Sequence, residues 1–213
     1  MTAKVSAHAK LTDKGSAPTR LIALEGTHGP DLVAAAGLLE RKLRDRKQEC
    51  GVSRWDSSNT FFEMRFAKSH ILTPSPRTLL LLYASDLVFR LRWEIRPALE
   101  EGKIMIAAPY VESAIAFGVA AGLPRNWLVE LFGFAPRPEA CYRLKEKKKH
   151  WHRKCEPGDG FLEFCAALLS SSHPSWNPEG LRLKSLEYLE ALENRQGCQP
   201  LKKKAVAEIC SRR

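Results

Sequence analysis

The stretch that decides the fold is Leu21-Ile22-Ala23-Leu24-Glu25-Gly26-Thr27-His28-Gly29. Four apolar residues followed by a glycine-containing turn are typical of a buried parallel strand. From 32 to 47, apolar residues recur at helical spacing between charged ones, which predicts an amphipathic helix. The sequence therefore predicts a strand, a glycine-rich loop and a helix, in that order.

The alternation of strands and helices continues along the chain. Short apolar runs bounded by turn residues predict further strands at 51–55, 103–108 and 141–144. Helical periodicity, in two places preceded by proline, predicts helices at 77–100, 111–121, 125–132, 160–170 and 178–194. This order indicates an α/β fold, with a mostly parallel sheet flanked by helices on both faces. No clear apolar strand occurs at 171–179, so we expect a smaller sheet or an irregular edge.

Length and composition indicate one domain with a sizeable core. The chain has 213 residues, of which 44% are hydrophobic and 27% charged, as in ordinary globular proteins. We expect a flexible leader at 1–19, the domain at 20–195 and a basic tail at 196–213. No apolar run approaches the about 20 residues of a membrane span, and no secretory signal is visible. These observations predict a cytoplasmic protein with no membrane partner.

The net charge of +10 is concentrated in two segments. Residues 141–154 hold seven Lys/Arg against one Glu, and residues 195–213 hold six against one. Such segments form a solvated face, an anion-binding lid, or a contact with nucleic acid or an acidic protein. The candidate anion contacts in the first segment are Lys147, Lys148, Lys149 and Arg153.

The six cysteines suggest neither disulfides nor metal. A chain of this length needs no disulfide, and no C-x-x-C pair occurs, so we expect reduced thiols. One set has the residue types of a zinc site, but its spacing is not that of a usual finger, and we predict no metal. That set is Cys141, His150, His152 and Cys155.

The order of these segments resembles the thymidylate kinases, which are P-loop nucleoside-monophosphate kinases. Residues 21–29 are similar to the family's first strand and phosphate loop, and 82–102 to its central helix. Residues 104–113 resemble the strand that normally ends in Asp-Arg-Tyr, and the basic segment 143–160 falls near the family's lid. The resemblance covers about 20–144 and implies a three-layer P-loop NTPase-like fold, a nucleotide ligand and a homodimer.

The phosphate loop has lost the residues that perform its chemistry. Such loops cradle phosphates with backbone N–H groups, neutralise them with a Lys and bind magnesium through Ser/Thr. In G-x-x-x-x-G-K-[ST] counted from Gly26, the last three positions hold Asp31, Leu32 and Val33. An Asp at a helix start accepts backbone N–H groups, so we expect its carboxylate to fill the phosphate site. The degenerate loop comprises Gly26, Thr27, His28, Gly29, Pro30, Asp31, Leu32 and Val33.

The second catalytic centre and the acceptor site are altered too. Where the family has Asp-Arg-Tyr, this chain has Ala108, Pro109 and Tyr110. Arg54 matches the arginine that reaches the monophosphate, although an ordinary surface arginine is the alternative. Phe117 stands where the family's Tyr contacts the base, and the alternatives are stacking on a base or packing in the core. An arginine expected near position 86 or 87 is absent.

Three functions follow from this resemblance and its departures. The first is a pseudokinase that has lost phosphoryl transfer and retains nucleotide binding or a partner-binding or regulatory role. The second is a divergent thymidylate kinase that uses Mg-ATP with substitute residues such as Arg54. The third is a module that binds nucleic acid or another polyanion through the basic segments. We assign no catalytic residue, no metal and no cofactor, except Mg-ATP if the second alternative holds.

Overall fold

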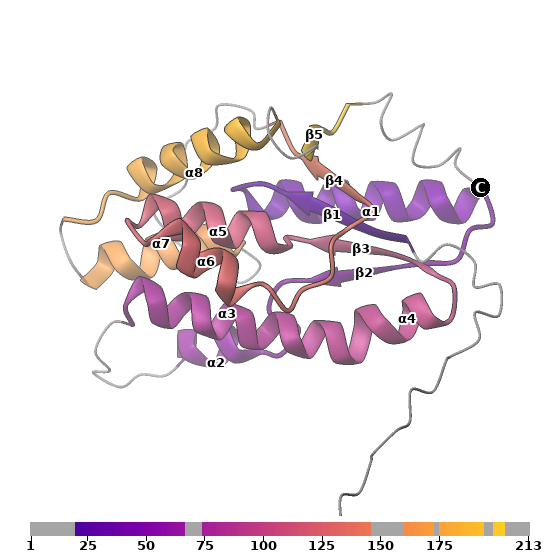
Figure 1. Ribbon diagram of the computed structural model, residues 1–213, viewed down its shortest axis with the longest axis horizontal. Helices are drawn as coiled ribbons and strands as arrows, with labels where there is room; N and C mark the ends of the chain where they lie inside the picture. Colours follow the sequence, from indigo (N-terminus) through magenta and orange to yellow (C-terminus); the bar gives the residue numbers. More distant parts are fainter. Residues whose placement is uncertain (1–19, 67–73, 146–159, 173–174, 194–197, 203–213) are drawn as a thin grey trace, which may run out of the picture.

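The computed structural model describes residues 20–66, 74–145, 160–172, 175–193 and 198–202 (Figure 1). Five strands form one sheet in the order β2-β3-β1-β4-β5, and every neighbouring pair is parallel. The parallel α/β fold predicted from the sequence is therefore confirmed, and it is of the P-loop NTPase type. The strands are β1 (Arg20–Glu25), β2 (Cys50–Arg54), β3 (Ile104–Ala108), β4 (Ala140–Arg143) and β5 (Cys198–Pro200).

The helices largely follow the predicted order. The long helix expected at 77–100 contains a π-helical turn, η1, just before Pro97, a residue that lacks the N–H of a regular helix. The helix α2 was not predicted. The helical segments are α1 (Gly29–Asp45), α2 (Thr60–Phe66), α3 (Pro76–Arg90), η1 (Leu91–Ile95), α4 (Arg96–Glu100), α5 (Val111–Ala120), α6 (Arg125–Leu131), α7 (Phe161–Ser172) and α8 (Pro178–Glu193).

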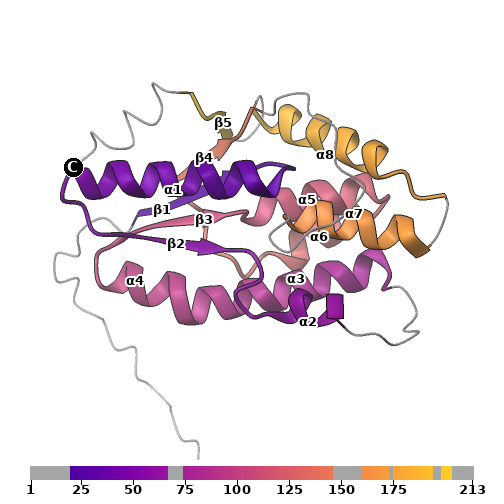
Figure 2. The ribbon, with the colours of Figure 1, turned by 180° about the vertical axis from the view of Figure 1, so that it is seen from behind.

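Alternating strand residues pack into two apolar layers, one on each face of the sheet. Ile22 and Leu24 of β1 pack with the buried face of α1, whereas Leu21 and Ala23 pack with α3, α5 and α7. Figure 2 shows α1 in front of the sheet, on the side opposite to α5 and α6. This arrangement places the amino end of α1 at the carboxyl end of β1, where ligands bind in open α/β sheets.

Two cysteines correct the expectation of reduced thiols. Cys141 of β4 and Cys198 of β5 are directly opposite in the parallel register and form a disulfide. The strand β5 comes from the segment expected to be a tail, so the sheet extends beyond residue 195. Cys50 and Cys165 are not disulfide-bonded. The other three members of the suggested zinc set lie outside the described residues, and Cys141 is committed to the disulfide.

No helix in the described ranges is both long and apolar enough to cross a lipid bilayer.

Candidate functional site

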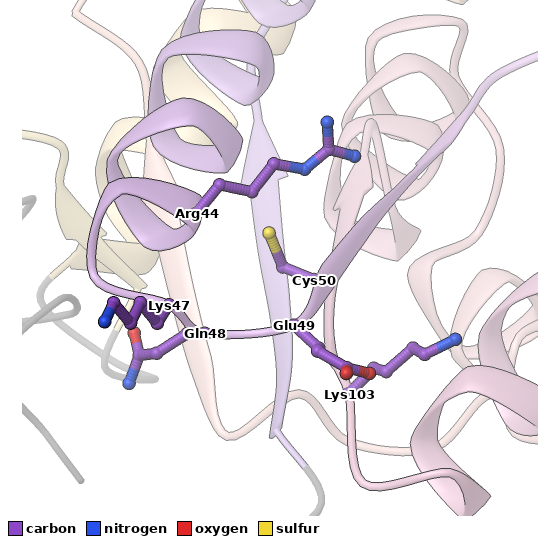
Figure 3. A pocket seen from close by; sticks show the side chains of 6 residues that line it. All are labelled: Arg44, Lys47, Gln48, Glu49, Cys50 and Lys103. Atoms are coloured by element: carbon purple, nitrogen blue, oxygen red, sulfur yellow. The ribbon is translucent and has the colours of Figure 1, made fainter.

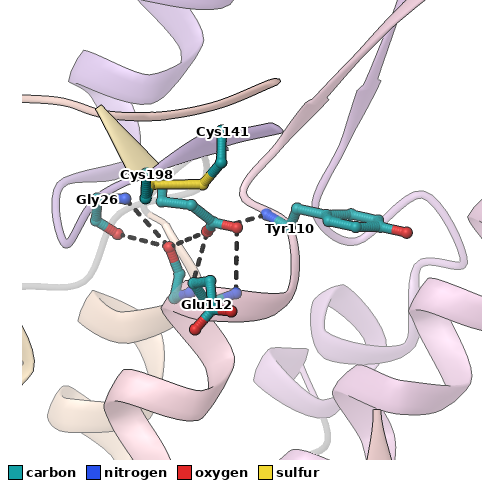
Figure 4. Close-up of a disulfide and its surroundings, with 7 residues drawn as sticks. Gly26, Tyr110, Glu112, Cys141 and Cys198 are labelled. Carbon is teal, nitrogen blue, oxygen red and sulfur yellow. Dashed lines mark hydrogen bonds between the residues drawn. A yellow bond between two sulfur atoms is a disulfide. The ribbon is translucent and has the colours of Figure 1, made fainter. Parts of the chain in front are cut away.

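A fully buried carboxylate joins the end of β1 to the start of α5. Glu25 accepts the N–H groups of Tyr110, Glu112 and Ser113 at 3.3, 3.1 and 2.9 Å, and the Ser113 hydroxyl at 2.6 Å (Figure 4). Burial raises the pKa of Glu25 to about 7. The Ser113 oxygen also lies 3.1 Å from the nitrogen of Gly26 and accepts its N–H. These bonds fix the first residue of the degenerate loop.

Asp31 does not occupy the phosphate site, contrary to the sequence-based expectation. It lies in the first turn of α1, but this helix has no side-chain cap. The Asp31 side chain is 51% exposed, and its carboxylate lies 3.2 Å from Nδ1 of His28. The carboxylate therefore points outward, because the helix begins at Gly29 and residue 31 lies past the N-cap position.

The loop is instead contacted by Glu163 of α7. Its Oε2 atom accepts the N–H of Gly29 at 2.8 Å and the N–H of Gly160 at 2.8 Å. Its Oε1 atom lies 3.5 Å from Nε2 of His28. The Glu163 side chain is only 12% exposed. The N–H of Gly29, which a phosphate oxygen in the loop would need, thus already donates to a carboxylate of the chain itself.

The positions that the sequence analysis compared with the family's catalytic residues lie in the core or at the surface. Leu32, at the position of the Lys, is 2% exposed and packs between α1 and the sheet, while Val33 is 40% exposed. Ala108 is buried in the same layer as Leu32. Tyr110 is 1% exposed and donates its hydroxyl to the carbonyl of Pro136 at 2.9 Å. None of these side chains presents a charge to the loop.

Arg90 is a residue of this region that the sequence analysis missed. Its side chain is fully buried and donates to Ser53 Oγ at 2.9 Å, to the Ser53 carbonyl at 3.1 Å and to the Pro109 carbonyl at 2.9 Å. Its guanidinium also lies 4.0 Å from the buried Asp86 carboxylate. A buried arginine thus lies one helical turn after position 86, although positions 86 and 87 themselves hold Asp and Leu. The spacing i, i+4 between Asp86 and Arg90 was the available signal.

Aromatic side chains fill the space beside the loop. Phe161 of α7 stands at the centre of this cluster, with its ring centroid 4.4 Å from Tyr83 and 5.4 Å from Phe117. Phe117 is fully buried, and the structure places its ring in the core. A Cβ added to Gly118 would lie 2.5 Å from a methyl group of Leu128, so any side chain there would require Leu128 to move. The aromatic cluster comprises Trp55, Phe61, Tyr83, Phe117, Phe161 and Phe164.

Two surface cavities lie away from this site. One, of about 360 Å³, is at the amino ends of β2 and β3, where Cys50 and Arg44 line it with Lys103 (Figure 3). The other, of about 390 Å³, lies on the outer face of α3, η1 and α4 beside Trp93. Neither touches the degenerate loop.

Comparison with curated proteins connects this geometry to one family. A protein named probable thymidylate kinase from Pyrococcus horikoshii is 37% identical over 84 residues, covering 39% of this chain and 41% of that protein. A protein of the same name from Pyrobaculum calidifontis is 42% identical over 88 residues, which cover 36% of this chain and 46% of that protein. A third probable thymidylate kinase, from Thermococcus kodakarensis, is 28% identical over 134 residues, which cover 58% of this chain and 64% of that protein. The chain is a relative of the thymidylate kinases.

The similarity to thymidylate kinases is partial. The matched segment spans about two fifths of the length of the Pyrococcus protein. No family model matches the chain. The comparisons therefore show a partial similarity in sequence, and activity and substrates have to be argued from the residues present.

The residues at the loop do not fit the magnesium-bound triphosphate that thymidylate kinases use. The described loop offers no Lys and no Ser/Thr at the required positions, and Glu163 presents a negative charge to Gly29. No group of three potential metal ligands occurs in the ranges that the structure describes. Arg54 is exposed at the end of β2. The basic candidates Lys147, Lys148, Lys149 and Arg153 lie outside the described residues, and their role in polyanion binding stays a prediction.

Proposed function

We propose that this chain is a thymidylate-kinase-like protein that has lost phosphoryl transfer and acts by binding, as a pseudokinase with a partner-binding or regulatory role. The observation that carries the proposal is the Glu163 carboxylate, 2.8 Å from the Gly29 nitrogen. Phosphoryl transfer depends almost entirely on positioning and on neutralising phosphate charge. A carboxylate at this position both blocks a donor N–H and repels the phosphates.

Three other features support the loss of activity. Leu32 is buried in the core, so the position of the catalytic Lys carries no charge. Ala108 and Pro109 replace the Asp-Arg pair, and neither side chain can bind a metal or a phosphate. The aromatic cluster fills the space next to the loop with the chain's own side chains. The donor and acceptor sites are therefore both altered.

A turnover assay tests this proposal. The purified protein is incubated with Mg-ATP and thymidine monophosphate, and an active thymidylate kinase serves as the positive control. We expect turnover at least about 10³-fold below the control, since losing a single charge-stabilising group in phosphoryl transfer already costs that much. Substantial turnover that the substitution Arg54→Ala abolishes would instead establish the divergent kinase with substitute residues.

We also propose that the chain forms the homodimer that its resemblance to thymidylate kinases implies. Large apolar side chains are exposed along α3 and η1, which suits a helix-packed interface. Trp93 is 62% exposed, and the guanidinium of Arg92 lies over its ring. The other exposed apolar residues of this face are Leu81, Val88 and Phe89.

Sedimentation velocity at micromolar concentration tests the homodimer. We expect wild-type protein to sediment as a dimer and the Trp93→Glu variant to sediment mainly as a monomer, because a charge in a desolvated interface is costly. Leu183→Glu on α8, where Leu183 is 47% exposed, is the matched control and should leave the dimer intact. A monomeric wild-type protein would contradict the proposal.

A further inference from the structure

We propose that the Cys141–Cys198 disulfide is a redox-sensitive latch for the last strand of the sheet. The disulfide joins β4 to β5 (Figure 4). While it is oxidised, β5 stays on β4, and its reduction by a dithiol releases β5 from a domain that remains folded. This inference goes beyond the proposed function and does not depend on it, because neither cysteine belongs to the degenerate loop.

The noncovalent contacts of β5 are weak. The strand has three residues, lies at the edge of the sheet and pairs there with β4. Gln199 is exposed, and Pro200 has no N–H to donate to the ladder. Directly after the strand, the partly buried Leu201 donates its N–H to the Arg143 carbonyl at 2.8 Å. Short edge segments of this kind open locally at low cost in free energy.

The disulfide reinforces the one well-buried anchor of β5. Cys198 is 3% exposed and packs in a small apolar cluster with Ala116 of α5 and with Leu189 and Leu192 of α8. Its partner Cys141 lies directly opposite in the parallel register, with 4.6 Å between the two Cα atoms. A disulfide restricts the conformations that the chain gains when a segment detaches. Breaking this bond therefore shifts β5 toward the detached state.

The rest of the domain has a core that does not need β5. The other four strands pair side by side, and residues 21–188 form the apolar layers on their two faces, with Leu201 at the margin of one layer. A chain of this size buries enough apolar surface to fold without a disulfide. Reduction should therefore act locally, on β5 and on the outer edge of β4.

The release is a thiol–disulfide exchange with a dithiol. Cys141 is partly exposed whereas Cys198 is buried, so we expect a thiolate of the dithiol to attack the Cys141 sulfur. The S–S bond breaks, Cys198 leaves as a thiolate that takes up a proton, and a mixed disulfide forms on Cys141. The second thiolate then attacks the dithiol's own sulfur in this mixed disulfide and releases Cys141, which also takes up a proton. The protein gains two electrons and two protons, and the dithiol is oxidised to its disulfide.

The test is hydrogen exchange of the full chain with and without dithiothreitol, in the absence of denaturant. Alkylation followed by mass spectrometry counts the thiols. We expect dithiothreitol to free both cysteines and to lower the protection of the Leu201 amide at least about tenfold. The amides of β1 and β3 should keep their protection, and oxidised dithiothreitol should restore that of Leu201.

Three variants separate the disulfide from other effects of the reductant. Cys198→Ser should show low protection of the Leu201 amide with or without dithiothreitol. If that variant does not fold, Cys141→Ser at the partly exposed partner carries the same expectation. Cys50→Ser is the matched control and should keep the full response, because Cys50 is not disulfide-bonded.

Several results would overturn the latch. Unchanged protection of Leu201 after both cysteines are reduced would mean that noncovalent contacts suffice to hold β5. Loss of protection throughout β1 and β3, or a disulfide that dithiothreitol reduces only after denaturation, would mean that the bond is a structural staple. Alkylation of all six cysteines in the oxidised chain would mean that no such bond forms. Each of these results leaves the expected lack of turnover with Mg-ATP untouched, so the two proposals fail separately.

Discussion

Replacing Arg90 by alanine is expected to lower the free energy of unfolding by about 3–5 kcal/mol, because it leaves a buried carboxylate without its cation. Asp86 is fully buried and accepts the N–H of Ser58 at 2.9 Å, so its carboxylate cannot turn toward water without breaking the loop after β2. The Ser53 hydroxyl and the Pro109 carbonyl also lose their donor.

Urea unfolding followed by circular dichroism measures this effect. Arg92→Ala is the matched control on the same helical stretch, since Arg92 is exposed, and it should change the free energy of unfolding by about 0.5 kcal/mol or less. Equal losses in the two variants would mean that the buried network around Arg90 does not stabilise the fold.

The position of Arg90 also bears on function. Arg90 lies at the carboxyl ends of β2 and β3, the edge of an open α/β sheet at which ligands bind. Here the guanidinium is enclosed and donates to Ser53 and Pro109, two residues of the chain itself. The positive charge is therefore used to hold β2, β3 and α3 together rather than to bind a ligand.

The sequence predicted the central part of the fold because its signals there are local. The apolar run of β1, the glycine turn and the periodicity of α1 each lie within a few residues, and the same holds for β3 between Gly102 and Pro109. The strand β5 carries no such signal, since Cys198–Pro200 is too short for a pattern. Its place is set by the register with β4 and by the disulfide, which depend on residues far apart in the chain.

The candidate site was only half predictable for the same reason. The missing Lys and Ser/Thr could be read directly from positions 32 and 33. The carboxylate that contacts the loop could not be read from the sequence, because Glu163 meets Gly29 only through tertiary packing. The sequence analysis expected Asp31 to fill the phosphate site because its carboxylate is nearest to the loop along the chain. Proximity along the chain does not identify the carboxylate that contacts the loop in the fold. Within Gly160-Phe161-Leu162-Glu163, the spacing of a capping pattern was the sole local hint.

Replacing Phe161 by alanine is the second change for which we expect a large effect, a loss of about 3–5 kcal/mol in the free energy of unfolding. Phe161 is 1% exposed, and its ring packs edge-on against Phe61 at 5.8 Å and Phe117 at 5.4 Å between centroids. The neighbouring rings come from α2, α3 and α5 and from the turn after β2, so the cavity cannot close by moving one of them. The measurement is urea unfolding, with Phe62→Ala as the control because Phe62 is 51% exposed.

This variant also separates packing from charge in the docking of α7. If apolar burial holds the first turn of α7 against the loop, Phe161→Ala should reduce the protection of the Gly29 amide against hydrogen exchange, although Glu163 is intact. If the Glu163 carboxylate alone holds the first turn of α7 against the loop, the protection of the Gly29 amide should fall only as much as the global free energy of unfolding falls. A Phe161→Ala variant with the stability of Phe62→Ala would show that the aromatic cluster does not carry the packing energy assigned to it.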